Sequence, residues 1–286
     1  MTPQDVMTRH ARSFAPAVRF LSPHDRARIA QLYALCRTVD DLADTVGGPD
    51  VAAQLAKLAT ALEDGQSHDP LVRKARTLFE GRHAGLMAFR RLVETVAKDT
   101  GTTLIVDENA LDAYCYGVAG TVGLMVCALF NISPRWHYAA VDLGKAMQLT
   151  NICRDVLADA QVGRRYLPAT LCPYSPAEIV DAASEPTEVN VNIRFAVGQL
   201  LTQADTLYAS GRGGLHALPI RLRLAVAAAT QMYAGIGGRL RAHGCDPLQG
   251  RVRVPTGKKL LLASGGVITA AWPLARTGHG GQNAAT

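Results

Sequence analysis

Aromatic residues are scarce in this sequence: Phe, Trp and Tyr make up 6% of the 286 residues, against 48% for hydrophobic residues as a whole. Because β-sandwich and β-barrel cores depend on aromatic and β-branched side chains, this composition favours a helical interior rich in Ala and Leu. No alternating strand pattern or strand–helix–strand rhythm is evident. Pro and Gly instead fall between long helical patterns. The sequence therefore predicts a single all-α bundle over residues 1–275, with a Gly/Ala-rich frayed tail over 276–286.

Closely spaced cysteine pairs are also missing. The six cysteines contain no CxxC pair and most lie in apolar runs, which favours buried free thiols in a reducing cytosol over disulfides or a zinc site. They are Cys36, Cys115, Cys127, Cys153, Cys172 and Cys245.

Long basic runs and long apolar runs are missing as well. The net charge is +6, but no Lys/Arg tract exceeds two residues, so the charge suits an anionic substrate or membrane surface and not a nucleic acid. The first 14 residues lack the continuous apolar stretch of a signal peptide. The apolar run at 260–275 is shorter than the ~20 residues of a spanning helix. We expect a cytoplasmic protein, and peripheral contact with the inner face of the membrane is compatible with this expectation. The sequence leaves the oligomeric state open.

Helix start and stop residues divide the chain into amphipathic segments. Ser22 and Pro23 form a helix start, and Gly47-Gly48-Pro49 forms a stop. The predicted helices span 23–45, 51–62, 70–79, 84–98, 107–128, 134–160, 193–210 and 219–242, and a last one starts near 255–262. A loop through Gly163 and a polar connection at 181–190 complete this pattern.

The stretch 148–168, QLTNICRDVLADAQVGRRYLP, carries the strongest chemical pattern. Asn151, Asp155 and Asp159 repeat at i, i+4 and i+8, which places three oxygen-bearing side chains near one helix face. Such oxygens suit Mg²⁺, which is usually held by a few carboxylates together with substrate phosphates. The nearby arginines are candidates for binding the remaining phosphate charge. They are Arg154, Arg164 and Arg165.

A second acidic stretch lies upstream, between residues 33 and 44. Asp40 and Asp44 again stand at i and i+4, with Arg37 and Tyr33 one and two turns earlier. A single acidic pair of this kind is as often a solvated helix face. Two such helices embedded in apolar sequence favour a shared Mg²⁺–diphosphate site, because a buried carboxylate without a counter-charge is costly.

The chain resembles the squalene/phytoene synthase family over nearly its whole length. The resemblance begins at His10-Ala11-Arg12-Ser13-Phe14 and includes the first acidic stretch. It is most specific in YCYGVAGTVGLM at 114–125 and in QLTNICRDVLADAQVGRRYLP at 148–168, and it ends near Leu218-Pro219. The 114–125 motif is closest to the phytoene synthase branch.

This resemblance implies an isoprenoid-synthase-like helical bundle around a central channel. It implies that two prenyl diphosphates condense head to head through a cyclopropylcarbinyl diphosphate, without NADPH when phytoene is the product. The implied cofactor is Mg²⁺, with Mn²⁺ as an alternative ion. The implied metal ligands are Asp40, Asp44, Asn151, Asp155 and Asp159.

The remaining site residues rest on the same resemblance. Tyr33, Arg37, Asp40, Asp44 and Tyr166 are the catalytic candidates. The substrate-binding candidates are His10, Ser13, Arg37, Tyr114, Val118, Gly120, Gln148, Asn151, Arg154 and Arg164. Arg239 and Lys258 are equally well read as basic contacts or as solvated surface. The small residues of the 114–125 stretch allow close approach of either a substrate chain or a second helix.

Two features bear on the product. Val18 and Ala30 stand where C15-using relatives are bulkier, which favours a C20 substrate, geranylgeranyl diphosphate, over farnesyl diphosphate. Ala158 stands where most relatives have an acidic residue, which removes one carboxylate beside the predicted metal site. The alternatives are a C15-using dehydrosqualene or squalene synthase and a non-catalytic homologue acting in assembly or lipid binding.

Overall fold

The computed structural model describes residues 2–10, 18, 20–46, 49–64, 67–185 and 187–249. The side chains of a few helical residues, including His10 and Asp44, also lie outside the description. Ser13, Lys258, the helix predicted near 255–262, the apolar run at 260–275 and the predicted tail fall outside the described residues.

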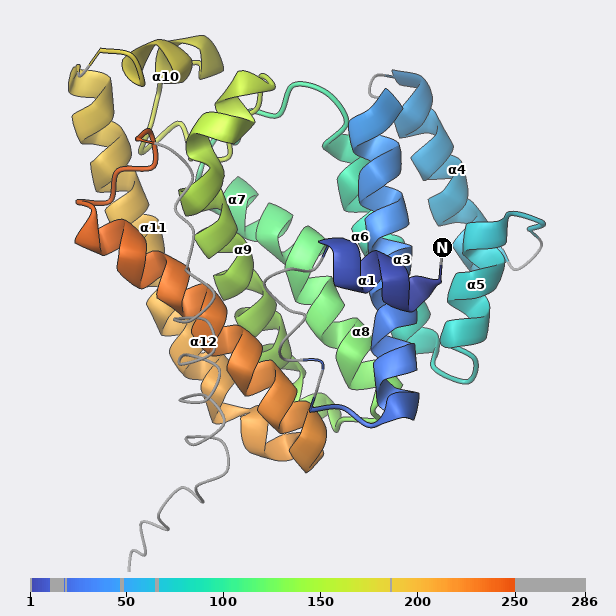
Figure 1. The fold of residues 1–286 in the computed structure, drawn as a ribbon. Coiled ribbons are helices and arrows are strands. Elements are labelled where there is room, and N and C mark those ends of the chain that lie inside the picture. Colours follow the sequence, from blue (N-terminus) through green and yellow to red (C-terminus); the bar gives the residue numbers. More distant parts are fainter. Residues whose placement is uncertain are drawn as a thin grey trace, which may run out of the picture.

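The described residues form a helical bundle (Figure 1). Extended backbone pairs in this part of the chain only at a single parallel bridge between Leu104 and Arg165. The helices are α1 (Pro3–His10), α3 (Pro23–Val46), α4 (Pro49–Asp64), α5 (Pro70–Leu78), α6 (His83–Lys98), α7 (Glu108–Cys115), η1 (Tyr116–Gly120), α8 (Thr121–Leu129), η2 (Pro134–Trp136), α9 (His137–Gln161), α10 (Pro176–Ala182), α11 (Glu188–Gly213), η3 (Leu215–Ala217) and α12 (Ile220–Ala242).

Side-chain caps explain where several helices begin. The hydroxyl of Ser22 accepts from the backbone N–H of Asp25 at 3.1 Å, as the Ser-Pro start predicts. Asp69 caps α5 by accepting from Leu71 N at 2.7 Å, and Asp107 caps α7 by accepting from Ala110 N at 2.7 Å. Each cap satisfies backbone donors that a helix start leaves without partners, so the predicted starts at these places are confirmed.

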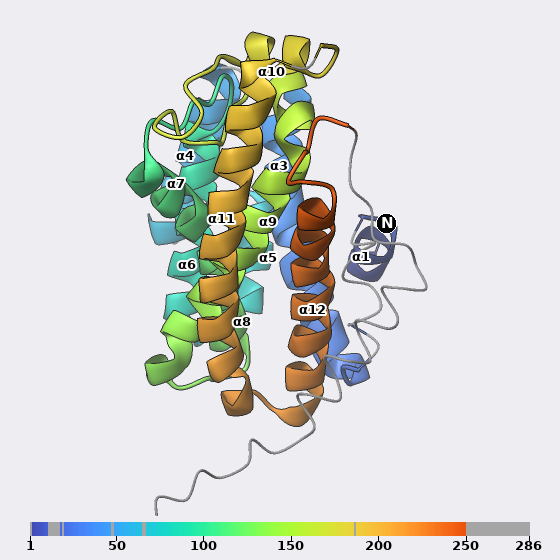
Figure 2. The same cartoon turned by 90° about the vertical axis from the view of Figure 1, so that its left-hand side faces the viewer.

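Helix α9 is the central element of one half of the bundle. It packs against α11, α8 and α12, and the buried side chains of this half form one continuous core. A second core lies between α3, α4, α6 and α8. Figure 1 shows α3 and α9 on either side of α8, and Figure 2 shows α11 and α12 covering the opposite face of α9.

Three sequence predictions need correction. The helix predicted over 107–128 is interrupted by a π-helical turn at Tyr116–Gly120, where small residues accommodate the wider turn. The connection predicted at 181–190 contains the end of α10 and the start of α11. The helix predicted from 134 begins as a 3₁₀ turn, and α9 proper starts at His137.

Two short helices were not predicted. Helix α10 has seven residues, too few for a hydrophobic period, and depends on a capping box between Ser175 and Glu178. Helix α1 has eight mostly polar residues.

The six cysteines are free, as predicted. Burial raises the pKa of Cys115 to about 12. Within the described part of the chain, one stretch, Glu108–Leu129, is long and apolar enough to cross a membrane by length and composition alone. It packs against α6 and α9, as expected for an interior helix of a bundle.

Candidate functional site

The predicted acidic ladder lies on α9, towards its carboxyl end. Arg154 donates from Nε to Oδ1 of Asp155 at 2.8 Å and from Nη2 to the second carboxylate oxygen. Both side chains are largely buried, with 14% of Arg154 and 17% of Asp155 exposed. The charge of the middle carboxylate is therefore balanced by its own neighbour in the chain.

Asn151, one turn earlier, presents an oxygen without a partner. Its Oδ1 is buried and accepts no hydrogen bond. A buried carbonyl oxygen in this state costs free energy unless a cation or donor reaches it. The Asn151 side chain has a hydrogen-bonding interaction with Tyr233 of α12, whose phenol pKa is raised by burial and lowered by Arg154 and by this interaction. The orphaned oxygen fits a metal ligand.

Asp159, one turn after Asp155, lacks sufficient positive charge around it. Burial and the nearby charge of Asp155 raise its pKa to about 7, while Arg164 lowers it and Asp99 raises it further. Such a carboxyl is about half protonated at pH 7, and a nearby cation would stabilise its ionised form. The ladder therefore contains one neutralised carboxylate, one uncompensated carboxyl and one unpartnered amide oxygen.

The first acidic stretch lies near the carboxyl end of α3. Arg37 pairs with Asp41 at 2.5 Å, while the side chain of Asp40 is exposed to solvent. Burial raises the pKa of Tyr33, with Arg37 lowering it and Tyr233 among the groups that raise it. Tyr233 thus lies within electrostatic reach of both predicted motifs.

The described side chains hold no group of three His, Cys, Asp or Glu residues close enough to bind a metal. The residues present instead fit an ion that is shared between a few side chains and the phosphates of a ligand, which is the usual arrangement for Mg²⁺.

Asp99, at the carboxyl end of α6, is a site residue that the sequence motifs did not reveal. Its Oδ2 accepts from the phenols of Tyr166 at 2.8 Å and Tyr114 at 3.0 Å, and its Oδ1 accepts from Thr103. The two tyrosine rings stack with centroids 4.8 Å apart and planes at 24°. Burial and Asp99 raise the pKa of Tyr114. Both candidate tyrosines are therefore fixed as donors to one carboxylate, beside Asp159.

The paired arginines after α9 have different roles. Arg164 donates from Nε to the carbonyl of Gly101 at 3.4 Å and lies close enough to Asp159 to lower its pKa. Arg165 is buried and donates to the carbonyls of Tyr174 and Ile105, each at 3.0 Å. These contacts favour a structural role for Arg165 over the phosphate contact that its place in the sequence suggests.

The small residues of 114–125 serve helix packing in this structure. A Cβ on Gly117 would lie 2.2 Å from Oγ1 of Thr95 on α6. A Cβ on Gly123 would lie 2.3 Å from the carbonyl oxygen of Ala140 on α9. Gly120 is also buried against α9, where a Cβ would lie 3.1 Å from Val141. Of the two earlier alternatives, close helix approach is the one that these contacts support.

Two predicted substrate contacts lie on either side of this packing. Val118 is partly buried in the core shared by α3 and α6. Gln148 is partly buried on α9, one turn before Asn151. Their contact with a substrate stays a prediction, as does that of Arg239, which lies in the last turn of α12.

The two positions predicted to set chain length lie together. Val18, 3% exposed, and Ala30, fully buried, belong to one apolar cluster with Leu222 and Ala225 of α12, and Tyr33 packs against it. This cluster connects the amino-terminal segment, α3 and α12.

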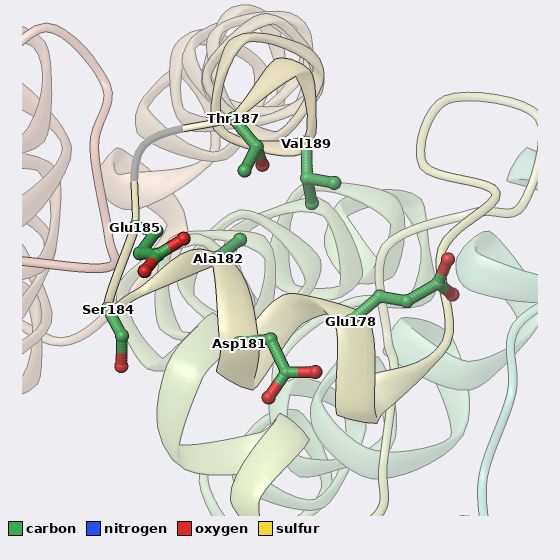
Figure 3. A pocket seen from close by; sticks show the side chains of 7 residues that line it. All are labelled: Glu178, Asp181, Ala182, Ser184, Glu185, Thr187 and Val189. Carbon is green, nitrogen blue, oxygen red and sulfur yellow. The ribbon is translucent and has the colours of Figure 1, made fainter.

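A separate hollow of about 450 Å³ lies between α10 and the start of α11 (Figure 3). Its lining includes the carboxylates Glu178, Asp181 and Glu185, with Ala182 and Val189 as apolar contacts. Glu178 is occupied in the cap of α10, where it accepts from Ser175. None of the predicted site residues lines this hollow.

This chain is similar to known proteins in family, in sequence and in fold. The model of a family described as squalene/phytoene synthase matches residues 7–258. A phytoene synthase of Rhodobacter capsulatus is 34% identical over 90% of this chain and 78% of its own length. A 15-cis-phytoene synthase of a Paracoccus species is 33% identical over 97% of this chain and 92% of its own length. The crystal structure of a dehydrosqualene synthase in complex with a ligand superposes with a TM-score of 0.81 and 25% identity, covering 94% of this chain and 95% of that one.

Proposed function

The chain belongs to the squalene/phytoene synthase family, and we propose that it is a prenyl transferase that condenses two geranylgeranyl diphosphates to phytoene in carotenoid biosynthesis. The structural observation that supports it most is the α9 ladder, where the unpartnered Oδ1 of Asn151 lies on the same helix as the uncompensated carboxyl of Asp159. Burial of these two groups without a partner raises the free energy of the folded protein. Both groups are oxygen ligands of the kind that bind Mg²⁺ together with phosphates.

We assign the metal to the oxygens of both acidic stretches. Asp40, Asp44, Asn151, Asp155 and Asp159 would hold Mg²⁺, or Mn²⁺ in its place. The bound ion would stabilise negative charge on the leaving diphosphate. This assignment is supported by the residue types, by the buried oxygen of Asn151 and by the raised pKa of Asp159.

The arginines orient the diphosphates. Arg37, Arg154 and Arg164 lie beside the acidic residues and carry charge that a diphosphate can bind. In this structure the guanidinium of Arg154 is paired with the carboxylate of Asp155. A bound diphosphate would compete with that carboxylate for the guanidinium. His10 and Ser13 would cover the bound diphosphate, and Gln148 would extend the polar face of α9.

The reaction then proceeds in two ionisations. Loss of diphosphate from the first substrate gives an allylic cation. The double bond of the second substrate attacks this cation, and loss of one proton closes the ring of a cyclopropylcarbinyl diphosphate. Loss of the second diphosphate, rearrangement and release of a second proton give phytoene, without any reductant. The rings of Tyr33 and Tyr166 would stabilise the cations, each by about 2 kcal/mol in a dry site. Tyr114, Val118 and Gly120 would contact the prenyl chain.

The C20 substrate is favoured over the C15 alternative. The relatives named phytoene synthases match at 33–34% identity, and Val18 and Ala30 lie together in one apolar cluster as a shared chain-length position requires. The intact set of oxygen-bearing residues argues against a non-catalytic homologue, which would have no reason to keep Asp40, Asp44, Asn151, Asp155 and Asp159 at this spacing.

Localisation follows from the substrate and the thiols. Six free cysteines suit a cytoplasmic protein, and a hydrocarbon product suits peripheral contact with the inner face of the membrane.

Product analysis tests this function. The purified protein is incubated with Mg²⁺ and either geranylgeranyl or farnesyl diphosphate, with and without NADPH, and the hydrocarbon is extracted. We expect phytoene from the C20 substrate without NADPH. A C30 product alone would refute the substrate assignment, and no product from either substrate would favour the non-catalytic homologue.

A further inference from the structure

One end of the bundle is rich in arginine. Helices α3, α9 and α12 begin there, and α8 and α11 finish there (Figure 1). Residues 20–28, 79–83, 129–142 and 210–223 make up this end, which we call the arginine end. They contain seven arginines and three carboxylates. The arginines are Arg26, Arg28, Arg82, Arg135, Arg212, Arg221 and Arg223, and the carboxylates are Asp25, Glu80 and Asp142.

Two of the three carboxylates are already engaged. Asp142 accepts from the hydroxyl of Ser210 at 2.5 Å. Asp25 accepts from Ser22 at 2.8 Å and lies 3.9 Å from Arg28. In contrast, Arg135, Arg212 and Arg221 are exposed. The amino-terminal dipoles of α3, α9 and α12 add positive potential at the same end, and the carboxyl ends of α8 and α11 offset part of it, so the exposed arginines supply most of the positive charge. The arginine end therefore attracts anionic surfaces.

Large apolar and aromatic side chains lie among these arginines. Tyr138 is 56% exposed and Ile220 is 54% exposed. The ring of Trp136 lies 6.4 Å from Tyr138 and 4.4 Å from His216, and the guanidinium of Arg135 lies 5.4 Å from the Trp136 ring. Tyr and Trp beside arginine are the residues that bind at the boundary between lipid headgroups and acyl chains. A purely electrostatic partner would not require an exposed isoleucine.

The arginine end also lies next to the chain-length cluster. Leu222, between Arg221 and Arg223, packs in the cluster that contains Val18 and Ala30. Arg28 lies over the ring of Phe130 at 5.0 Å, and Phe130 packs against the same cluster. Asp40 lies 17 residues along α3 from Pro23, about 26 Å at the α-helical rise. The acidic motifs and the arginine end are therefore at opposite ends of the same helices.

We propose that the arginine end docks the protein on an anionic phospholipid bilayer, so that the hydrocarbon product leaves the chain-length cluster directly into lipid. This proposal rests on the proposed function for the identity of the product. The bilayer supplies the negative charge for Arg135, Arg212 and Arg221 and the apolar boundary for Tyr138 and Ile220.

Vesicle sedimentation tests the docking. Binding of the full chain is measured on vesicles of phosphatidylcholine alone and of phosphatidylcholine with phosphatidylglycerol. The test variant carries Arg135→Glu, Arg212→Glu and Arg221→Glu. The matched control carries Lys57→Glu, Arg73→Glu and Lys74→Glu, which reverses the same number of exposed charges on α4 and α5.

We expect the wild type to bind the anionic vesicles and the test variant to bind at least about 100-fold more weakly, because each arginine near an anionic surface contributes about a fivefold factor. The control should stay within a fewfold of wild type. Tyr138→Ser with Ile220→Ser should weaken the binding that remains at high salt. Equal losses in test and control variants, or equal binding to both vesicle types, would overturn the proposal.

Turnover in detergent solution separates this proposal from the proposed function. The test variant should keep wild-type turnover with detergent-dispersed substrate and lose activity only when the product must enter vesicles. A wild type that binds vesicles but makes no hydrocarbon would refute the function and leave the docking intact.

Discussion

The phenol of Tyr166 donates to Oδ2 of Asp99 at 2.8 Å, across 67 positions of sequence. The same oxygen accepts from Tyr114, so the end of α6 fixes two tyrosines that come from the two most specific motifs of the chain. Asp99 is therefore a positioning residue for the stacked tyrosine pair.

Replacing this carboxylate should affect turnover through the tyrosines. Asp99→Asn should lower kcat roughly 10- to 100-fold with little change in KM, because the amide donates where the carboxylate accepts and the rings lose their fixed positions. The check is a double-mutant cycle with Tyr166→Phe. In the Phe background, Asp99→Asn should cost much less. Additive losses would mean that Asp99 acts on something other than Tyr166.

Asp159 should make the metal-free protein sensitive to pH. Its pKa is raised from 3.8 in the unfolded chain to about 7 in the fold, so the protonated form is favoured by folding. The stability that this proton supplies is fully present below about pH 4 and is lost as pH rises from there to the folded pKa of about 7. We expect the Tm of the wild type to fall more between pH 5 and pH 8.5 than that of Asp159→Asn.

Mg²⁺ with diphosphate provides the control for that measurement. It should raise the Tm of the wild type at pH 8.5 and leave Asp159→Asn nearly unchanged. Identical pH profiles for the two proteins would show that Asp159 is not the group responsible.

Chain length should respond to the size of residue 30. Ala30 is fully buried in the cluster with Val18, so Ala30→Phe should fill space used by the last isoprene unit of a C20 chain. We expect turnover to shift from geranylgeranyl towards farnesyl diphosphate by tenfold or more, measured by the length of the extracted hydrocarbon. Circular dichroism excludes unfolding, and Ala30→Val should give a smaller shift. A uniform loss with both substrates would contradict the assignment.

The packing role of the small residues is testable by stability alone. Gly123→Ala places a Cβ against the backbone carbonyl of Ala140 and should destabilise the fold by about 1–3 kcal/mol. Gly238→Ala is the matched control, because its Cβ would meet nothing within 4 Å on α12. That change should stabilise the helix by about 0.5–1 kcal/mol. Chemical denaturation measures the free energy of unfolding of both variants. Equal changes in the two would show that a Cβ at residue 123 fits beside Ala140 without a clash.

Much of the fold was predictable because its signals are local. The Ser22 start of α3 and the Asp107 cap of α7 depend on side chains within three residues. The π turn at Tyr116–Gly120 was not predictable, because it depends on contacts with α6 and α9 that no local pattern contains. Helix α10 was missed because seven residues hold too few apolar positions to show a period.

The candidate site was likewise predictable where its signals are local in sequence, and not where they depend on tertiary contacts. The spacing of Asn151, Asp155 and Asp159 is local, and the sequence places all three on α9 as observed. The structural contacts of Arg165 were not predictable, because its carbonyl partners at Ile105 and Tyr174 belong to loops whose positions depend on tertiary packing. Tyr233 was missed for the same reason, since it reaches the ladder from another helix, α12.

Binding of inorganic diphosphate, measured by calorimetry with and without Mg²⁺, tests whether the two acidic stretches form one site. Wild-type protein should bind diphosphate saturably only when Mg²⁺ is present, and both Asp40→Asn and Asp155→Asn should lose that binding while keeping their helical content. Two acidic stretches on different helices would then serve one ion-and-diphosphate site. Binding that ignores Mg²⁺, or that survives in either variant, would contradict the account.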